Sequence, residues 1–199
     1  MIIKNIHHVY QFKISLNNFK PSIWRRIIVP STYSFWDLHV AIQDSMGWYD
    51  YHLHMFEIKD PETNIKVEIG SPDEEFEAFN RRVLADHKEK ILKYFSRNNN
   101  TARYEYDFGD SWIHTVKLEK ILPVTIGEKY PKCLAGKMAC PPEDCGGIPG
   151  YYHMLSVLSD SNNEEYTEMI EWLGGKFDPE KFDPDNVIFD DPKERFKQI

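Results

Sequence analysis

The sequence predicts an α+β domain in which a mixed, mainly antiparallel β-sheet, made from hairpins, packs against helices. Three features of the chain indicate this fold class. Residues 9–16 alternate between apolar and polar side chains, residues 35–46 repeat apolar side chains at helical spacing, and residues 104–118 alternate again on both sides of a Gly-Asp pair. A long loop rich in Pro and Gly and an irregular acidic C-terminal tail complete the prediction.

The chain is expected to begin with a hairpin followed by a helix. Residues 9–16 have the period of two of a half-buried strand, and residues 23–29 are rich in β-branched side chains up to a proline. Two Asn and a Pro between them mark a turn. Ser34 and Asp37 have the spacing of a capping box, which predicts a helix over residues 35–46 that a glycine ends.

The rest of the chain alternates between strand and helix signals and then loses both. Apolar periodicity and turn residues define each boundary. In order, the expected elements are strands at 52–58 and 65–69, a helix at 88–95, a hairpin of 104–108 and 112–118, a loop at 123–149, helices at 151–158 and 166–173, and the tail from 176.

The second hairpin predicts the centre of the core. Trp112 shares one face of its strand with Val116 and Leu118, so we expect it to be buried. The partner strand contributes a row of aromatic side chains on one face: Tyr104, Tyr106 and Phe108.

Length and composition indicate one domain. The 199 residues, 41% of them hydrophobic, suit a single core, and no polar linker divides the chain. We expect residues 1–175 to form the domain and residues 176–199 to pack on it as a tail. No stretch approaches the roughly 20 apolar residues of a membrane span, and the N-terminus lacks the apolar run of a signal peptide, which favours a cytoplasmic protein that does not enter a membrane.

Charge bears on the kind of partner. The net charge is −8, with 5 Lys and Arg against 12 Asp and Glu in residues 160–199. This balance disfavours non-specific nucleic-acid binding and makes a protein partner the better expectation. A local basic face stays open as an alternative to ordinary solvated charges, with these members: Arg25, Arg26, Arg81, Arg82, Lys88 and Lys93.

Three histidines and a carboxylate form the first candidate site. His52 and His54 would project from one face of a strand about 6.5 to 7 Å apart, and His114 lies on a strand that could be a neighbour. Imidazoles are common ligands of transition metals, and Asp110 could complete the site or act as a base. The favoured alternative is that these histidines are hydrogen-bonded at the edge of an aromatic core.

Three cysteines form a second, weaker candidate. Cys133, Cys140 and Cys145 have C-x6-C-x4-C spacing, which lacks the close pairs of structural zinc sites and needs a fourth ligand such as Asp144 or His153. An odd number of clustered cysteines is also no disulfide framework, which suits a reducing compartment. We expect free or packed thiols and no cofactor, with zinc or another divalent metal as the alternative.

The Pro/Gly-rich loop is the third candidate. We expect a rigid lid in which Glu143 and Asp144 bind nearby backbone donors, since the carboxylates argue against a phosphate cradle. Loops on a rigid sheet often carry recognition. The candidate binding surface therefore combines residues 130–150 of this loop region with three aromatic residues: Trp48, Tyr106 and Trp112.

Four blocks of sequence resemble the plasmid pRi open-reading-frame-three-like family. They are FKISLNNFKPSIWRRIIVP at 12–30, GWYDYHLHMFEI at 47–58, YEYDFGDSWIH at 104–114 and YPKCLAGKMACPPEDCGGIPGY at 130–151. The resemblance implies a fold and an association with plasmids and mobile elements, but no established reaction and no catalytic residues. The chain departs from the family where it has Ser111 in place of a frequent Gly and Ile113 in place of a frequent Glu.

Two functions are compatible with these observations. Without a complete catalytic motif, the sequence favours a binding or regulatory domain of mobile-element type. The alternative is a metal-dependent hydrolase that uses His52, His54, Asp110 and His114.

Overall fold

The fold is a single sheet with helices on one face and at one end. The computed structural model describes residues 8–71 and 82–197. Within them the eight strands have the order β5-β4-β3-β6-β7-β1-β2-β8, and every neighbouring pair is antiparallel except β4 and β5. The strands are β1 (His8–Leu16), β2 (Trp24–Pro30), β3 (His54–Lys59), β4 (Lys66–Gly70), β5 (Val83–Ala85), β6 (Thr101–Tyr106), β7 (Trp112–Pro123) and β8 (Lys132–Lys137).

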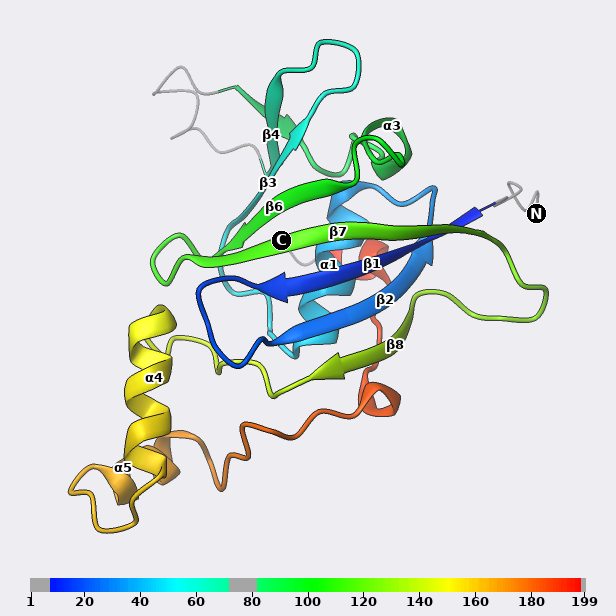
Figure 1. The fold of residues 1–199 in the computed structure, drawn as a ribbon. Coiled ribbons are helices and arrows are strands. Elements are labelled where there is room, and N and C mark those ends of the chain that lie inside the picture. The colour runs from blue at the N-terminus through cyan, green and yellow to red at the C-terminus, as the bar shows by residue number, and fades with distance from the viewer. Residues whose placement is uncertain (1–7, 72–81, 198–199) are drawn as a thin grey trace.

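The predicted α+β class is confirmed by this sheet together with its helices. Helix α1 covers one face of the sheet, and α4 and α5 lie beyond one end of the strands (Figure 1). The helices are α1 (Phe35–Met46), α3 (Ile91–Tyr94), α4 (Gly147–Leu158), α5 (Tyr166–Trp172), the 3₁₀ turn η1 (Pro184–Asn186) and α6 (Pro192–Phe196). No helix among the described residues is long and apolar enough to cross a bilayer.

Helix α1 has the ends that its sequence predicts. The Ser34 hydroxyl accepts a hydrogen bond from the Asp37 backbone N–H at 3.1 Å, and the Asp37 carboxylate accepts one from the Ser34 N–H at 2.7 Å. Gly47 ends the helix at φ +94°, a conformation that glycine adopts without a steric cost. The capping box therefore fixes where α1 starts. The apolar side of α1 packs on the sheet.

The two predicted hairpins are both present. β1 pairs with β2, and β6 pairs with β7 so that Tyr104 lies opposite His114 and Tyr106 opposite Trp112. These side chains are buried, as the alternation predicts. Phe108 is the exception, because it lies in the turn after β6, where the alternation of the strand no longer applies, and 40% of it is exposed.

Two predicted elements need correction. The helix expected at 88–95 is only the single turn of α3, because the N–H groups of Lys88 and Glu89 bond to the Ala85 carbonyl in a preceding turn. The loop expected at 123–149 contains the edge strand β8, which pairs with β2. The helices predicted near 151–158 and 166–173 are confirmed as α4 and α5.

The acidic tail runs along β8 and then along α1. The Ala139 N–H donates to the Pro179 carbonyl, and the Phe182 ring lies so close to Gly136 that no side chain would fit there. Further on, the Arg195 guanidinium donates to Asp44 of α1 at 2.6 Å. The tail thus packs on the sheet edge and on the helix.

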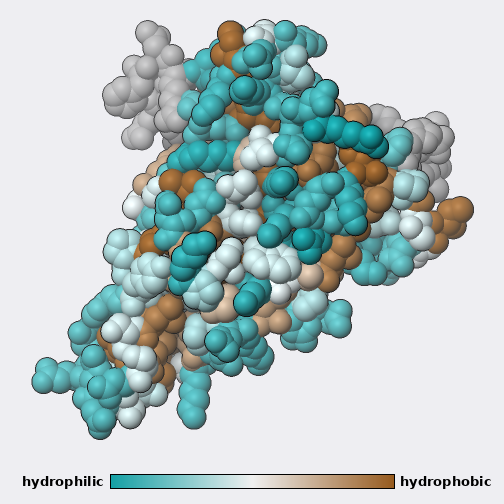
Figure 2. Space-filling view, in the orientation of Figure 1, coloured by the Kyte–Doolittle hydropathy of each residue, from teal (hydrophilic) through white to brown (hydrophobic). Residues whose placement is uncertain are grey.

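The open face of the sheet is largely hydrophilic (Figure 2). The residues of the possible basic face have different surroundings. Arg25 is buried and donates to backbone carbonyls, and Arg26 pairs with Glu119 at 2.6 Å. Three others, Arg82, Lys88 and Lys93, are exposed. Arg81 lies outside the described residues.

Candidate functional site

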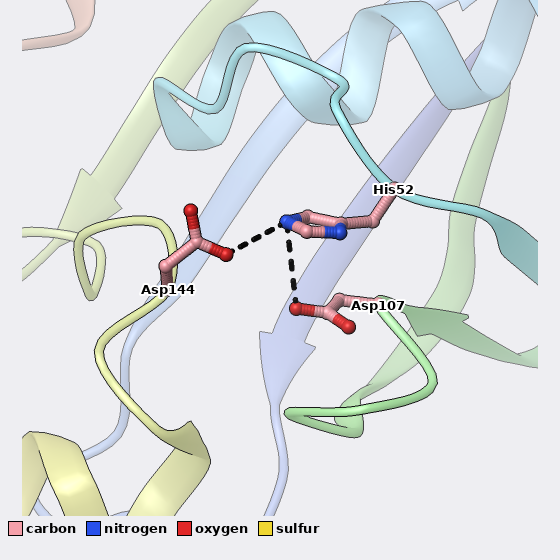
Figure 3. Close-up of side chains that lie close together, drawn as sticks. All are labelled: His52, Asp107 and Asp144. Carbon is pink, nitrogen blue, oxygen red and sulfur yellow. Dashed lines mark hydrogen bonds and ion pairs between the residues drawn. The ribbon is translucent and has the colours of Figure 1, made fainter.

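Three segments that are distant in the sequence meet at the end of the sheet near α4. His52 comes from the loop before β3, Asp107 from the turn after β6, and Asp144 from the loop before α4 (Figure 3). His52 Nε2 lies 2.9 Å from Asp144 Oδ1 and 3.7 Å from Asp107 Oδ2. One nitrogen and two carboxylate oxygens thus point toward one another, all within 4.8 Å.

The turn after β6 holds Asp107 with one oxygen free. Its Oδ1 accepts hydrogen bonds from the Gly109 and Asp110 N–H groups at 2.9 and 3.3 Å. Asp107 itself has φ +56°, a strained value for a residue with a side chain. Oδ2 is therefore left to face His52.

The Pro/Gly-rich loop is fixed against the other two segments. Glu143 accepts from the Tyr49 N–H at 2.7 Å and from the Tyr106 hydroxyl at 3.0 Å, and its Oε2 lies 3.8 Å from His52 Nε2. Glu143 thus binds a backbone donor, as expected of this lid, whereas Asp144 instead contacts His52. The loop is also tied to the turn after β6, where Asp110 Oδ2 accepts from a backbone N–H of this loop at 3.2 Å.

These atoms suit a divalent cation. Ligands about 2.0 to 2.2 Å from one ion lie roughly 3.0 to 3.5 Å from each other. The 2.9 and 3.7 Å separations from His52 are close to that range, and the two carboxylate oxygens, within 4.8 Å of each other, would move together on binding. One imidazole with carboxylates suits ions such as Zn²⁺ and Mn²⁺. Within residues 8–71 and 82–197, this is the group of His, Cys, Asp or Glu side chains with such spacing.

The predicted histidine site is only partly assembled. His52 joins the cluster, and Asp110 positions the loop beside it. His54 instead lies 3.0 Å from Asp86, and His114 is buried with its Nδ1–H donating to the Trp112 carbonyl. The expected side-by-side arrangement of His52 and His54 fails because β3 begins only at His54, so His52 follows a loop path.

The three cysteines are free thiols, and among the described residues they are not part of the group of His52, Asp107 and Asp144. Burial raises the pKa of Cys133, raises that of Cys140 strongly, and raises that of Cys145 to about 12. Without a bound ion, these thiols are therefore protonated at neutral pH. That these cysteines hold no metal stays a prediction.

The aromatic residues expected on a binding surface lie in the core. Trp48, Tyr106 and Trp112 are at most 4% exposed, because their rings pack together, with the Trp48 centroid 5.0 Å from that of Tyr106 and 6.0 Å from that of Trp112. Exposed aromatic side chains at this end include Phe108 together with Tyr49 and Tyr51, whose ring centroids lie 5.6 Å apart.

A second histidine arrangement was not predicted from the sequence. The rings of His39 and His54 stack 3.5 Å apart, and each meets a carboxylate: His39 Nε2 lies 2.7 Å from Asp50 and His54 Nε2 3.0 Å from Asp86. His39 is one member of the helical repeat and carries no signal of its own. In the first cluster, the only feature of the sequence that marks Asp107 as a site residue is its position between a strand and a glycine turn.

The electrostatics of this pair follow from burial and proximity. Burial, reinforced by His54, lowers the pKa of His39 to about 4, so the ring is neutral at pH 7. Burial opposes ionisation of Asp86, but the nearby histidines and the His87 N–H outweigh it, and the pKa of Asp86 is lowered. The stacked pair therefore lies beside an ionised carboxylate.

Comparison with known proteins places the chain among uncharacterised relatives. The uncharacterized protein y4hQ of Sinorhizobium fredii (strain NBRC 101917 / NGR234) is 34% identical over 171 residues, which cover 83% of this chain and 81% of that protein. The crystal structure of MM3350 from Methanosarcina mazei Go1, a protein of unknown function, is 48% identical with a TM-score of 0.86, over 93% of this chain and all of that one. The sequence profile of the plasmid pRiA4b ORF-3-like protein family matches residues 8–186, and the chain belongs to that family.

Proposed function

We propose that this protein is a binding domain whose site contains a divalent cation held by His52, Asp107 and Asp144. The observation that carries the proposal is the convergence of three ligand atoms within 4.8 Å from three separate segments. Each segment is held by hydrogen bonds of its own, so the ligands do not depend on an ion for their placement.

Charge supports a cation at this point. The carboxylates of Asp107, Glu143 and Asp144 lie around one imidazole, and the sequence places no Lys or Arg between residues 138 and 150. Like charges this close are unfavourable unless a positive charge lies among them. A bound ion would supply that charge.

The ion would leave room for a ligand of the domain. The side chain of Asp144 is 65% exposed, so coordination positions on the solvent side would be open. A carboxylate or carbonyl oxygen of a partner protein could occupy such a position. Tyr49 and Tyr51, on the neighbouring loop, offer exposed apolar area for the same partner.

Calorimetric titration of EDTA-treated protein with Mn²⁺, Zn²⁺ and Mg²⁺ tests the proposal. We expect one site for Mn²⁺ or Zn²⁺ and at least a tenfold loss of affinity in His52→Gln, Asp107→Asn and Asp144→Asn. Glu128→Gln is the matched control, since it removes a carboxylate from a surface ion pair with Lys132. Absence of a site, or equal affinity in the control and the three variants, would overturn the proposal.

A metal-dependent hydrolase is the second candidate, because open coordination positions are what an ion needs to activate water. The cation ligands would then be His52, Asp107 and Asp144 in place of the set expected from the sequence. Metal-dependent turnover of a chromogenic ester or phosphate panel, abolished by Asp107→Asn, would favour the enzyme. Ion binding without turnover would favour the binding domain.

A further inference from the structure

A hollow in the surface lies beside the stacked rings of His39 and His54. It encloses about 440 Å³, within the range of small-molecule sites, and it opens between α1, the start of β3, the end of β5 and α6. Most of its lining surface is apolar and comes from four side chains: Trp36, Tyr51, Leu53 and Phe196.

The polar part of its lining is incompletely satisfied. His54 Nε2 and Asp86 Oδ2 lie 3.0 Å apart without the alignment of a hydrogen bond, and neither atom has another partner among the described residues. The two residues are only 4% and 2% exposed, and both line the hollow. The two atoms face each other as a buried ion pair, and a ligand that donates a hydrogen bond would supply the aligned donor that Asp86 Oδ2 lacks.

The surroundings hold these groups in place. The His54 ring stacks on His39, which is itself fixed by Asp50 and by the Tyr104 hydroxyl at 2.8 Å. The other oxygen of Asp86 accepts from the His87 N–H at 2.6 Å. The Asp86 side chain can therefore rotate only slightly.

Charge decides the class of ligand. Asp50 and Asp86 line the hollow, and none of the described residues that line it is Lys or Arg. The Arg195 guanidinium lies 2.6 Å from Asp44 and 2.5 Å from Asp190 but 4.0 Å from Asp50, so its close ion pairs are with Asp44 and Asp190. Acidic groups beside aromatic walls are the surroundings that a cation on an apolar stem prefers.

We propose that this hollow binds a small organic amine, with its ammonium group at Asp86 and its apolar body against Trp36 and Phe196. The inference does not depend on the cation site. His52 also lines the hollow, but the atoms that would hold the amine belong to other residues.

Binding of benzylamine to metal-free protein tests the proposal, with benzyl alcohol and benzoate as the neutral and anionic probes of similar size. Chemical shifts of backbone amides would report affinity and location. We expect saturable binding of benzylamine near Trp36, at least tenfold weaker binding of benzyl alcohol, and none of benzoate. Equal affinity for the amine and the alcohol, or no saturable binding of the amine, would overturn the proposal.

Two variants make the test independent of folding defects. Asp86→Asn should weaken benzylamine binding at least tenfold while leaving that of benzyl alcohol unchanged. Because Asp86 is buried, Phe196→Ala provides a second variant at a 44% exposed position, and it should weaken both probes. Asp183→Asn, which removes a carboxylate from the tail, is the control. Unaltered benzylamine affinity in both test variants would place the amine elsewhere and overturn the assignment.

Discussion

Trp112 lies at the centre of the core with 1% of its surface exposed, and its ring centroid is 6.0 Å from that of Trp48. Truncation to Ala removes a buried aromatic ring and leaves a cavity, so Trp112→Ala should lower the free energy of unfolding by about 3 to 5 kcal/mol. Urea denaturation measures this. Tyr49→Ala, at a 71% exposed position, should change the midpoint little. An unchanged midpoint for Trp112→Ala would contradict its placement in the core.

His114 makes stability depend on pH. Burial lowers its pKa in the folded protein to about 3, against an ordinary value of 6.5. Between these values the unfolded chain binds a proton that the folded one does not, so the free energy of unfolding falls as pH falls from 6.5 toward 3. This histidine contributes up to about 1.4 kcal/mol per pH unit to that slope.

The variant His114→Gln should flatten the pH dependence of the urea midpoint between pH 6.5 and 4, with His39 responsible for part of the slope that remains. His153→Gln serves as control, since His153 is an exposed histidine paired with Glu165. Identical slopes in the His114 variant and the unaltered protein would show that His114 titrates normally in the folded state.

Side-chain burial was predictable at this scale, but side-chain partners were not. The alternation around Trp112 and Tyr104 identifies which residues face inward, because the period of two is local. The contact between His52 and Asp144 spans 92 residues, and the stacking of His54 on His39 joins a strand to a helix. Such pairs depend on how the elements pack, which no local pattern contains.

At the scale of elements, the junction between the turn after β6 and α4 depends on a glycine. Gly147 has φ +66°, and a Cβ there would lie 2.6 Å from the Asp110 carbonyl oxygen. Gly147→Ala should therefore destabilise the protein, by more than about 1 kcal/mol, and weaken cation binding by displacing the loop that carries Asp144.

Gly174 offers a matched control, because its φ is +68° but a Cβ at that position would meet no atom within 4 Å. Gly174→Ala incurs the conformational cost without the collision. Urea midpoints and Mn²⁺ titrations of both variants should separate the two effects. If both variants lost equal stability and kept equal affinity, close approach at Gly147 would have no role in the site.

Elements were predictable where local signals are strong. The capping box of Ser34 and the final glycine give α1 within a residue, since both features act within one turn. β8 was missed because a short edge strand with Gly136 among its residues has little pattern of its own and forms through pairing with β2. Its existence is decided by a strand about a hundred residues earlier.

At the scale of the whole molecule, contacts of the acidic tail contribute to the stability of the domain. Phe182 packs under the Arg25 guanidinium with a ring-to-cation distance of 3.7 Å, and Arg195 anchors the tail to α1. A chain ending at Gly175 would expose Arg25 and the β8 edge. We expect its urea midpoint to fall markedly, whereas Ile188→Ala, at an 82% exposed tail position, should leave it unchanged. An equally stable truncated chain would show that the tail is only an appendage.

Strands that are neighbours in the sheet are not always consecutive in the sequence, so they are not synthesised one directly after the other. β1 lies between β2, which follows it at once, and β7, which begins about a hundred residues later. A nascent chain therefore emerges with β1, an inner strand of the sheet, unpaired on one side until residues 112–123 have been synthesised. Exposed strand edges invite pairing with other chains, and contacts between distant residues form slowly. The period before β7 emerges is consequently when this protein is most exposed to misassembly and would gain most from a chaperone.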